Sequence, residues 1–413
     1  MEKEIKIGVL GLKRGLCLAE SARQNNMKIV AICDHCPEVL EGALPKFSEL
    51  GIRAYSDYDE FLKHDMDAVI IANFFNEHAP YAIKALNADK HVISECAANI
   101  TLAEGVALCR AVESTQKVYM IAENYCYTKF ILEMRKIYQS GEIGRVLYAE
   151  GEYNHPMSTK EFNAIAPGLN HWRNLIPSTY YCTHATAPLM FITDTVPVQV
   201  NALSVPAGDM LKGTARKSPD VFAPILLTMD NDAIFRVTGW GLLAGHSNWY
   251  RAHGTKGAME VVRGPGYFGT ERVRVWHEPY QVPEGFEADR DYTPDWPFCK
   301  ELAEKAGHGG GDFWTLYYFA EAIRSNIQPY LDVYKACAMS SIGVLGWKSV
   351  LNNGAAFEMP DFKNEVSRKK YENDHFNPFD LSQKIPLGIK GTREPSQKDI
   401  ELAQSEWADR KEV

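Results

Sequence analysis

A glycine turn between two apolar segments constrains this chain more than any other feature. The apolar run 5–10 leads into a turn at Gly11, a helix follows from about residue 15, and a second apolar run at 28–33 ends at Asp34. Glycines in such a turn let backbone N–H groups approach a pyrophosphate, and a carboxylate after the second strand can accept both hydroxyls of a ribose. The order therefore predicts a dinucleotide-binding unit that takes NAD, because Asp34 would repel the 2′-phosphate of NADP.

The turn departs from the full G-x-G-x-x-G fingerprint. Lys13 stands where the second glycine belongs, and Gly15 comes one residue early. We expect Gly11 and Leu12 to line the cofactor with their backbone. The side chains of Lys13 and Arg14 either bring positive charge to the pyrophosphate or point into solvent, and the sequence leaves both alternatives open.

Composition limits the class of protein. A chain of 413 residues is too long for one ordinary core, so at least two domains are expected. Its 44 basic and 53 acidic residues give a net charge of −9, which disfavours binding to nucleic acid or to an anionic membrane. The run at 5–10 leaves no room for a signal peptide, and no apolar run reaches the ~18 residues that cross a bilayer. We expect a cytoplasmic protein.

Cysteines and histidines show no metal-binding spacing. The nine cysteines are scattered, mostly in apolar segments, which is typical of reduced core residues. Cys33 and Cys36 form a C-x-x-C without a second pair. The histidines show no H-E-x-x-H, and no G-x-S-x-G marks a serine hydrolase. The sequence predicts no metal site.

Periodicity predicts an α/β protein in two parts. Short apolar runs at 5–10, 28–33, 67–72, 90–93 and 118–122 alternate with helical stretches, which indicates a parallel sheet buried on both faces. From about residue 145, strand-like runs follow one another, and helices are expected at 312–325 and 332–351. We expect a Rossmann domain at 1–123, an α+β domain with an open, mostly antiparallel sheet at 124–355, and an extended C-terminal arm at 356–413.

The whole layout resembles the Gfo/Idh/MocA oxidoreductases. In that family the fifth strand usually ends in Glu-Lys-Pro, with the lysine touching nicotinamide and substrate. This chain has Glu95-Cys96-Ala97 instead. One branch also lacks the lysine: the NAD-dependent glycosidases typified by α-N-acetylgalactosaminidase.

Five segments resemble motifs of that branch. The resemblance implies that Asn124, in Glu-Asn-Tyr-Cys-Tyr, contacts NAD and that Tyr153, in Gly-Glu-Tyr-Asn-His, contacts the substrate. It also implies a sugar-binding Arg173 beside Trp172. The tetrapeptide Tyr181-Cys182-Thr183-His184 resembles Tyr-Pro-Thr-His, with cysteine in place of proline. A glycine-rich loop at 307–312 fits as well, and Tyr250 is a nearby candidate for a second aromatic contact to the sugar.

Further cofactor contacts are expected after the fourth and fifth strands. Asn73, Asn76 and His78 follow the fourth strand, where the family's cofactor loop runs, although His78 could equally line the next helix. Glu95 ends the fifth strand and could orient the nicotinamide. Cys96 is interpreted as a small spacer, because nothing nearby in sequence would lower its pKa.

The expected chemistry is oxidation of a sugar hydroxyl. His184 is the candidate base because imidazole titrates near neutral pH. Tyr153 and Tyr181 are candidates for removing the C2 proton or steadying an enolate, and ordinary packing is an equal alternative. The leading hypothesis is a redox-neutral glycosidase that oxidises C3 transiently, eliminates the C1 substituent, adds water and reduces C3 again. A net sugar or cyclitol dehydrogenase and a noncatalytic NAD-holding sensor are the alternatives. Self-association through the second sheet and the arm is also expected.

Overall fold

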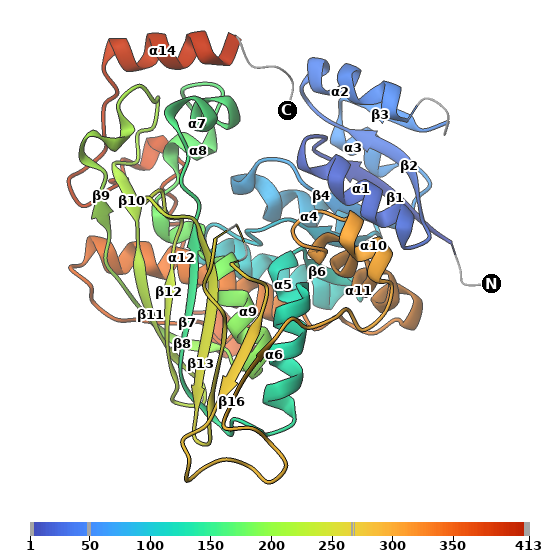
Figure 1. Ribbon diagram of the computed structural model, residues 1–413. Coiled ribbons are helices and arrows are strands. Elements are labelled where there is room, and N and C mark those ends of the chain that lie inside the picture. The colour runs from blue at the N-terminus through green and yellow to red at the C-terminus, as the bar shows by residue number, and fades with distance from the viewer. Residues whose placement is uncertain (1–3, 48–50, 266, 268, 409–413) are drawn as a thin grey trace. The chain divides into compact units, whose positions relative to one another are not determined.

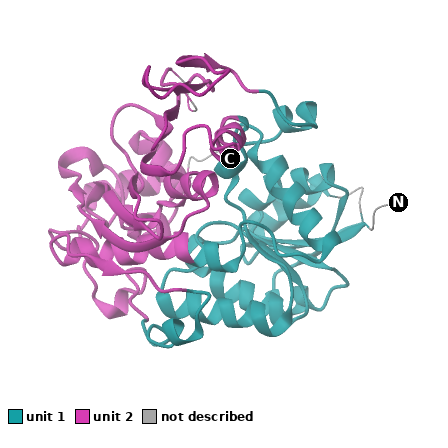
Figure 2. Cartoon of the chain, turned by 90° about the horizontal axis from the view of Figure 1, so that it is seen from below, with its two compact units in different colours: residues 1–129, 295–337, 362–374 teal, residues 130–294, 338–361, 375–413 magenta. Residues whose placement is uncertain are grey.

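The computed structural model describes residues 4–47, 51–265, 267 and 269–408. The chain divides into two compact units (Figure 2), of which unit 1 comprises residues 1–129, 295–337 and 362–374 and unit 2 the remainder. Throughout the described ranges, no helix combines the length and the apolar character that a membrane crossing requires.

Unit 1 is built on a six-stranded parallel sheet in the order β3-β2-β1-β4-β5-β6 (Figure 1). Its strands are β1 (Ile5–Leu10), β2 (Met27–Cys33), β3 (Arg53–Tyr55), β4 (Ala68–Ile71), β5 (His91–Ser94) and β6 (Tyr119–Ile121). The strand order reverses between β1 and β4, and ligands of open α/β sheets bind outside the carboxyl ends of the strands at such a point. The glycine turn after β1 lies at this reversal.

The helices of unit 1 follow the strands that the periodicity predicts. They are α1 (Arg14–Gln24), α2 (Pro37–Ala43), α3 (Tyr58–Leu62), α4 (His78–Asn87), α5 (Leu102–Thr115), α10 (Lys300–Lys305), α11 (Gly311–Ser325) and α13 (Glu365–Arg368). A capping box of Thr101 and Glu104 fixes the start of α5. Late in the sequence, α11 returns to pack against α1, so the cofactor unit takes residues from both ends of the chain.

Unit 2 is built on a nine-stranded sheet in the order β16-β15-β14-β13-β7-β12-β11-β8-β17. All neighbouring pairs are antiparallel except β7 and β12. The strands are β7 (Val146–Asn154), β8 (Pro197–Ala202), β11 (Pro224–Met229), β12 (Ile234–Thr238), β13 (Ser247–Gly254), β14 (Ala258–Val261), β15 (Val273–Trp276), β16 (Asp289–Tyr292) and β17 (Phe357–Glu358). A separate two-stranded sheet joins β9 (Val205–Pro206) to β10 (Asp220–Phe222).

Helices cover the sheet of unit 2 and form its outer parts. They are α6 (Lys129–Gln139), α7 (Thr159–Ile165), α8 (Trp172–Leu175), α9 (Thr183–Thr193) and α14 (Gln397–Ala408), and α12 (Val333–Leu351) continues into this unit from unit 1. The whole of α9 is buried, and it packs on β7 and β13. Short 3-10 turns lie at 44–46, 75–77, 124–127, 178–180, 208–211 and 381–383.

The fold class expected from the sequence is confirmed: a Rossmann-like parallel sheet precedes a largely antiparallel one. The expected domain boundaries remain a prediction, and the structure adds detail to them. Residues 295–337 and 362–374 belong with the cofactor sheet, although the sequence assigns them to the second domain and the arm. The expected extended arm contains β17 and the twelve-residue helix α14.

Candidate active site

The turn after β1 is closed by glycine for a steric reason. Gly11 has a φ of +83°, and a Cβ on it would lie 2.4 Å from the backbone of Ala72 at the end of β4. Its N–H donates to the carbonyl of Cys33, 2.9 Å away. The turn therefore holds the ends of β1, β2 and β4 together, directly before the N-terminus of α1, where an anionic group is favoured.

Asp34 lies beside this turn, as the sequence predicts. One carboxylate oxygen accepts the N–H of Leu12 at 2.9 Å and the other accepts the N–H of Cys36 at 3.0 Å. Each oxygen has a second lone pair, so the two can still accept ribose hydroxyls. Asp34 therefore fixes the shape of the glycine turn and keeps the capacity to bind a ribose.

Arg14, the first residue of α1, takes part in a buried ionic network. Its Nε donates to Glu95 at 2.8 Å, and its two terminal nitrogens donate to the two oxygens of Asp312 at 2.8 and 2.6 Å. Burial raises the pKa of Asp312, but the hydrogen bonds and charges of Arg14 and His308 outweigh it and hold that pKa well below its ordinary value. Arg14 thus connects the cofactor helix to the strand that ends at Glu95.

Asn124 is the third partner of Asp312. Its Nδ2 donates to Asp312 at 2.8 Å, which fixes the orientation of the amide. Its Oδ1 is buried and accepts no hydrogen bond from the described residues. The same holds for Oδ1 of Asn73 and of Asn76. Such acceptors are costly unless a ligand satisfies them, so the carboxyl edge of this sheet suits a ligand that donates hydrogen bonds, as the NAD ribose and carboxamide do.

The side chain of His78 contacts the loop after β4. Its ring nitrogens contact the carbonyls of Ala97 and Asn73, at 3.0 and 3.3 Å, and burial lowers its pKa. These contacts connect the start of α4 to the loops after β4 and β5, which is a role that neither of the two alternatives includes. A direct cofactor contact of His78 remains a prediction.

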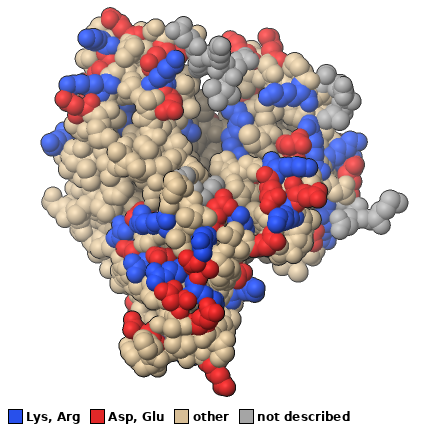
Figure 3. Space-filling model, viewed as in Figure 1, with Lys and Arg blue, Asp and Glu red and all other residues tan. Residues whose placement is uncertain are grey.

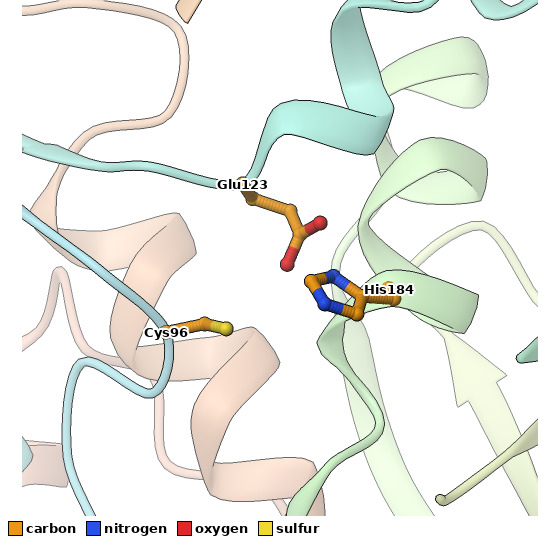
Figure 4. Close-up of side chains that lie close together, drawn as sticks. All are labelled: Cys96, Glu123 and His184. Carbon is orange, nitrogen blue, oxygen red and sulfur yellow. The ribbon is translucent and has the colours of Figure 1, made fainter. Parts of the chain in front are cut away.

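Cys96 and Glu123 follow the adjacent strands β5 and β6. Figure 4 shows their side chains directed toward each other, and the sulfur and a carboxylate oxygen lie within 4.8 Å. The figure also labels His184 on α9. A thiol and a carboxylate thus occupy the region where the related dehydrogenases are expected to carry a lysine.

In unit 2, close packing of α9 on β7 positions His184. A Cβ on Gly151 would lie 2.0 Å from the carbonyl oxygen of Ala185, so only glycine lets the helix approach the strand this closely. The ring of His184 lies edge-on to that of Tyr153, with 4.8 Å between centroids, and 5.2 Å from that of Tyr181. All three predicted catalytic side chains therefore form one cluster.

Trp172 and Arg173 lie next to this cluster. The guanidinium of Arg173 stacks on the ring of Trp172 at 4.2 Å, and Trp172 stacks in turn on Tyr181 with an angle of 14° between planes. Burial raises the pKa of Tyr153 well above its ordinary value, although Arg173 acts in the opposite direction. The effect of burial on the pKa of Tyr153 thus outweighs that of Arg173.

Two further predicted substrate-binding residues lie in or against α9. The hydroxyl of Tyr250 donates to the carbonyl of His184 at 2.6 Å, and the residue is fully buried. This contact differs from the sugar contact expected for Tyr250. Thr183 is buried as the first residue of α9, directly before the catalytic candidate, and its sugar contact remains a prediction.

Sequence reasoning missed Asn248, His155 and His246. Asn248 is the cross-strand partner of Tyr153, and the rings of His155 and His246 lie 4.6 Å apart. Asn248 lies on β13, His246 directly precedes that strand, and His155 directly follows β7. Only the pairing of the two strands brings these residues together, so no local sequence signal could have revealed them.

Comparison with known families identifies the two parts of the chain. Residues 5–123 match the model described as the oxidoreductase family, NAD-binding Rossmann fold. Residues 214–369 match the C-terminal domain of glycosyl hydrolase 109. The N-terminal part is thus similar to the Gfo/Idh/MocA oxidoreductases and the later part to the glycosyl hydrolase 109 proteins.

Particular relatives cover most of the chain. A glycosyl hydrolase family 109 protein of Stenotrophomonas maltophilia is 25% identical over 410 residues, which span 87% of this chain and 89% of that protein. An alpha-N-acetylgalactosaminidase of Tannerella forsythia is 24% identical over 396 residues, 81% of each chain. Among solved structures, levoglucosan dehydrogenase in complex with NADH aligns with a TM-score of 0.72 at 19% identity, over 87% of this chain and 100% of that one. The similarity to levoglucosan dehydrogenase shows the fold alone.

Unit 1 therefore binds NAD, in agreement with the glycine turn and the buried amides that lie at the carboxyl edge of its sheet. Gly11, Leu12 and Asp34 would hold the pyrophosphate and ribose, and the amides of Asn73, Asn76 and Asn124 would face the nicotinamide half. The individual contacts remain predictions, as do those of Lys13 and Cys96.

Proposed function

We propose that this enzyme hydrolyses glycosides by a redox-neutral route on a pyranoside. NAD, held by Gly11, Leu12 and Asp34, would supply the redox chemistry when bound, as an acceptor of hydride from C3 of the sugar that is regenerated in each cycle. The net reaction is glycoside plus water giving free sugar plus aglycone. No external oxidant is consumed.

His184 takes the proton of the C3 hydroxyl as that carbon is oxidised. The resulting ketone acidifies the hydrogen on C2, whose removal expels the substituent at C1. Tyr153 keeps its own proton at neutral pH, because burial raises its pKa, so it donates a hydrogen bond to the enolate oxygen. Tyr181 is the residue that removes the proton from C2. The C1 substituent leaves with the electron pair of its bond and takes up a proton from the solvent. Water then adds at C1 while a proton returns to C2, and His184 returns its proton to the C3 oxygen as C3 is reduced.

Arg173 and Trp172 hold the sugar in this scheme. A guanidinium offers several N–H donors in a fixed plane and suits neighbouring hydroxyls. The stacking of Arg173 on Trp172 at 4.2 Å limits the rotation of that plane. The observation that carries the proposal is the His184 ring set against two phenols, 4.8 and 5.2 Å away. It is supported by the match of residues 214–369 to the C-terminal domain of glycosyl hydrolase 109.

The test is an aryl glycoside panel with catalytic NAD in deuterated water. Aglycone release with deuterium at C2 and no accumulation of NADH is the expected result. Stoichiometric NADH without aglycone would instead establish a net sugar or cyclitol dehydrogenase. Release without deuterium at C2 would remove the elimination step.

Two variants accompany this assay. We expect His184→Asn to abolish turnover, whereas His253→Asn, a half-buried histidine further along β13, leaves turnover unchanged. A noncatalytic sensor would show no turnover with any sugar in the wild type, and its biological activity would survive the loss of His184 but not of Asp34.

We also infer a cytoplasmic homo-oligomer. All nine cysteines lie in described residues and none forms a disulfide, as in proteins of reducing compartments. The uncovered face of the unit 2 sheet carries interleaved charges (Figure 3), such as Arg236 paired with Glu150 and Arg263 paired with Glu152. Such a face suits a second copy with the same pattern. Light scattering during size exclusion tests the assembly, and a monomer throughout would contradict it.

A further inference from the structure

Asn248 on β13 is a buried amide whose polar atoms are not used by the protein. It is only 3% exposed. Neither its Oδ1 nor its Nδ2 has a hydrogen-bond partner among the described residues. A buried amide is normally hydrogen-bonded, because it loses its water on folding. Both atoms of Asn248 are therefore available to a ligand.

The register of the sheet places Asn248 beside the catalytic candidates. It is directly opposite Tyr153 in the antiparallel pair of β13 and β7, and residues opposite each other project from the same face. Two residues further along β13, Tyr250 projects from that face too and donates to the carbonyl of His184. Asn248 thus lies on the face that α9 covers, next to the ring that contacts His184.

The neighbourhood of Asn248 also contains space and further polar rings. A cavity of about 50 Å³ borders Asn248 and His246, several times the ~10–15 Å³ that one water needs. The ring of His155 lies 6.1 Å from that of Tyr153, and His246 lies 4.6 Å beyond it. Burial lowers the pKa of both histidines, so these rings are uncharged at neutral pH and suit a neutral, hydrogen-bonding ligand.

Asn154, the last residue of the neighbouring strand β7 and the cross-strand partner of Ser247, shows what a structural asparagine does in this region. Its Nδ2 donates to the carbonyls of Leu243 and Gly245, and its Oδ1 accepts the N–H of Leu243 at 3.1 Å. Both of its polar atoms are therefore used to hold a loop. Asn248 is equally buried and makes none of these contacts.

We propose that Asn248 is a specificity-determining residue that binds the sugar through both amide atoms, beside Tyr153. An amide offers one acceptor and two donors in one plane. Its complement is a ligand group that also presents a donor and an acceptor side by side. On a pyranoside, two neighbouring hydroxyls and an acetamido substituent both meet this requirement. The proposal rests on the proposed sugar site, but holds equally for a dehydrogenase.

The test measures sugar binding apart from turnover. The full-length protein saturated with NADH is titrated with free N-acetylgalactosamine, galactose and 2-deoxygalactose, and binding is followed calorimetrically. We expect Asn248→Ala to weaken the preferred sugar by tenfold or more, since about 1.4 kcal/mol per lost interaction corresponds to a factor of ten. NADH affinity and the melting temperature should be unchanged. Asn154→Ala, the matched control, should instead lower the melting temperature.

The three sugars show whether Asn248 recognises an acetamido group or two neighbouring hydroxyls. If Asn248 binds an acetamido group, the variant loses affinity for N-acetylgalactosamine and little for galactose. If it binds neighbouring hydroxyls, galactose is affected and 2-deoxygalactose is not. Equal affinities of variant and wild type for every sugar bound would overturn the proposal. A melting temperature that falls as far as in Asn154→Ala would also overturn it, by showing a structural role. Failure of aglycone release alone would contradict the glycosidase mechanism but not the proposed role of Asn248 in sugar binding.

Discussion

Arg14 donates hydrogen bonds to both carboxylate oxygens of Asp312, although 298 residues separate them in sequence. Asp312 also accepts from Asn124, whose Oδ1 is buried and has no hydrogen-bond partner among the described residues. A residue in the first turn of α11 therefore orients an amide that is expected to contact NAD. The cofactor unit depends on this late segment for its geometry.

Replacing Asp312 with Asn should destabilise the protein. The change removes a nearly fully buried charge and leaves Arg14 with only Glu95. Breaking a buried ion pair costs about 3–5 kcal/mol, and the partial exposure of Arg14 places the expected loss near ~3 kcal/mol. Urea unfolding measures it. Asp209→Asn, at an exposed pair with Lys212, is the control and should leave stability unchanged. An equal effect of both variants would contradict the role of Asp312.

The same carboxylate predicts an acid limit to stability. Its pKa in the folded protein is held below the ordinary value of 3.8, so its contribution is present above that value and is lost as pH falls toward the folded pKa. The stability difference between wild type and Asp312→Asn should be constant between about pH 5 and 8 and should shrink below about pH 4. Thermal unfolding of both proteins over this range measures it. A difference that grows in acid would contradict the assignment.

Asp34 should determine the choice of dinucleotide. Asp34→Ala removes the acceptor for the ribose hydroxyls and the hydrogen bonds to Leu12 and Cys36. We expect NADH affinity to fall roughly tenfold to a hundredfold. The preference for NADH over NADPH should also decrease, because the carboxylate that repels the 2′-phosphate of NADPH is gone. Fluorescence titration measures both. Asp65→Asn, at an exposed pair with Lys6, is the control. An unchanged preference would mean that another group selects the cofactor.

Much of unit 1 could be predicted because its signals are local. The run 5–10 and the segment ending at Asp34 have strand and turn signals within a few residues, and the structure confirms both elements. The three-residue strand β3 was missed because it is too short to show a period and is half exposed. The contribution of residues 295–337 was missed for a different reason. Which unit a late helix joins depends on long-range packing, such as that of α11 on α1.

The candidate site was predicted where residues are close in sequence or follow a known motif. Tyr181 and His184 lie on one tetrapeptide, and their clustering with Tyr153 agrees with the family pattern. Asn248 could not be found that way, because its importance arises from being opposite Tyr153 in the sheet and from having no polar partner. The contact of Tyr250 with His184 could not be predicted for the same reason: the direction of its hydroxyl depends on how α9 packs, which one position in a sequence does not show.

Gly151→Ala should separate packing from chemistry at this site. The added methyl group would lie 2.0 Å from the carbonyl oxygen of Ala185, and backbone atoms must move to admit it. Overpacking typically costs about 1–3 kcal/mol, and the displaced α9 would carry His184 away from Tyr153. We expect a lower melting temperature and reduced turnover with NADH affinity unchanged. A variant with wild-type turnover would show that the spacing between α9 and β7 is not critical.

Tyr153 should act with its proton in place. Burial raises its pKa well above the ordinary value of 10, and the opposing charge of Arg173 does not compensate. The phenol therefore stays protonated throughout the range of about pH 6 to 9, in which turnover can be measured. Tyr153→Phe removes one hydrogen-bond donor to a developing oxyanion, and such losses reduce turnover about 10²–10³-fold. We expect the rates to fall by this factor at every pH, with both limbs of the pH profile in the same places as in the wild type.

If Tyr153 were instead the base for the C2 proton, the wild type would show an alkaline rise that the phenylalanine variant lacks. Measuring kcat/KM of both proteins across that range decides between the two roles, because hydrogen-bond donation and proton abstraction depend on opposite states of the same oxygen.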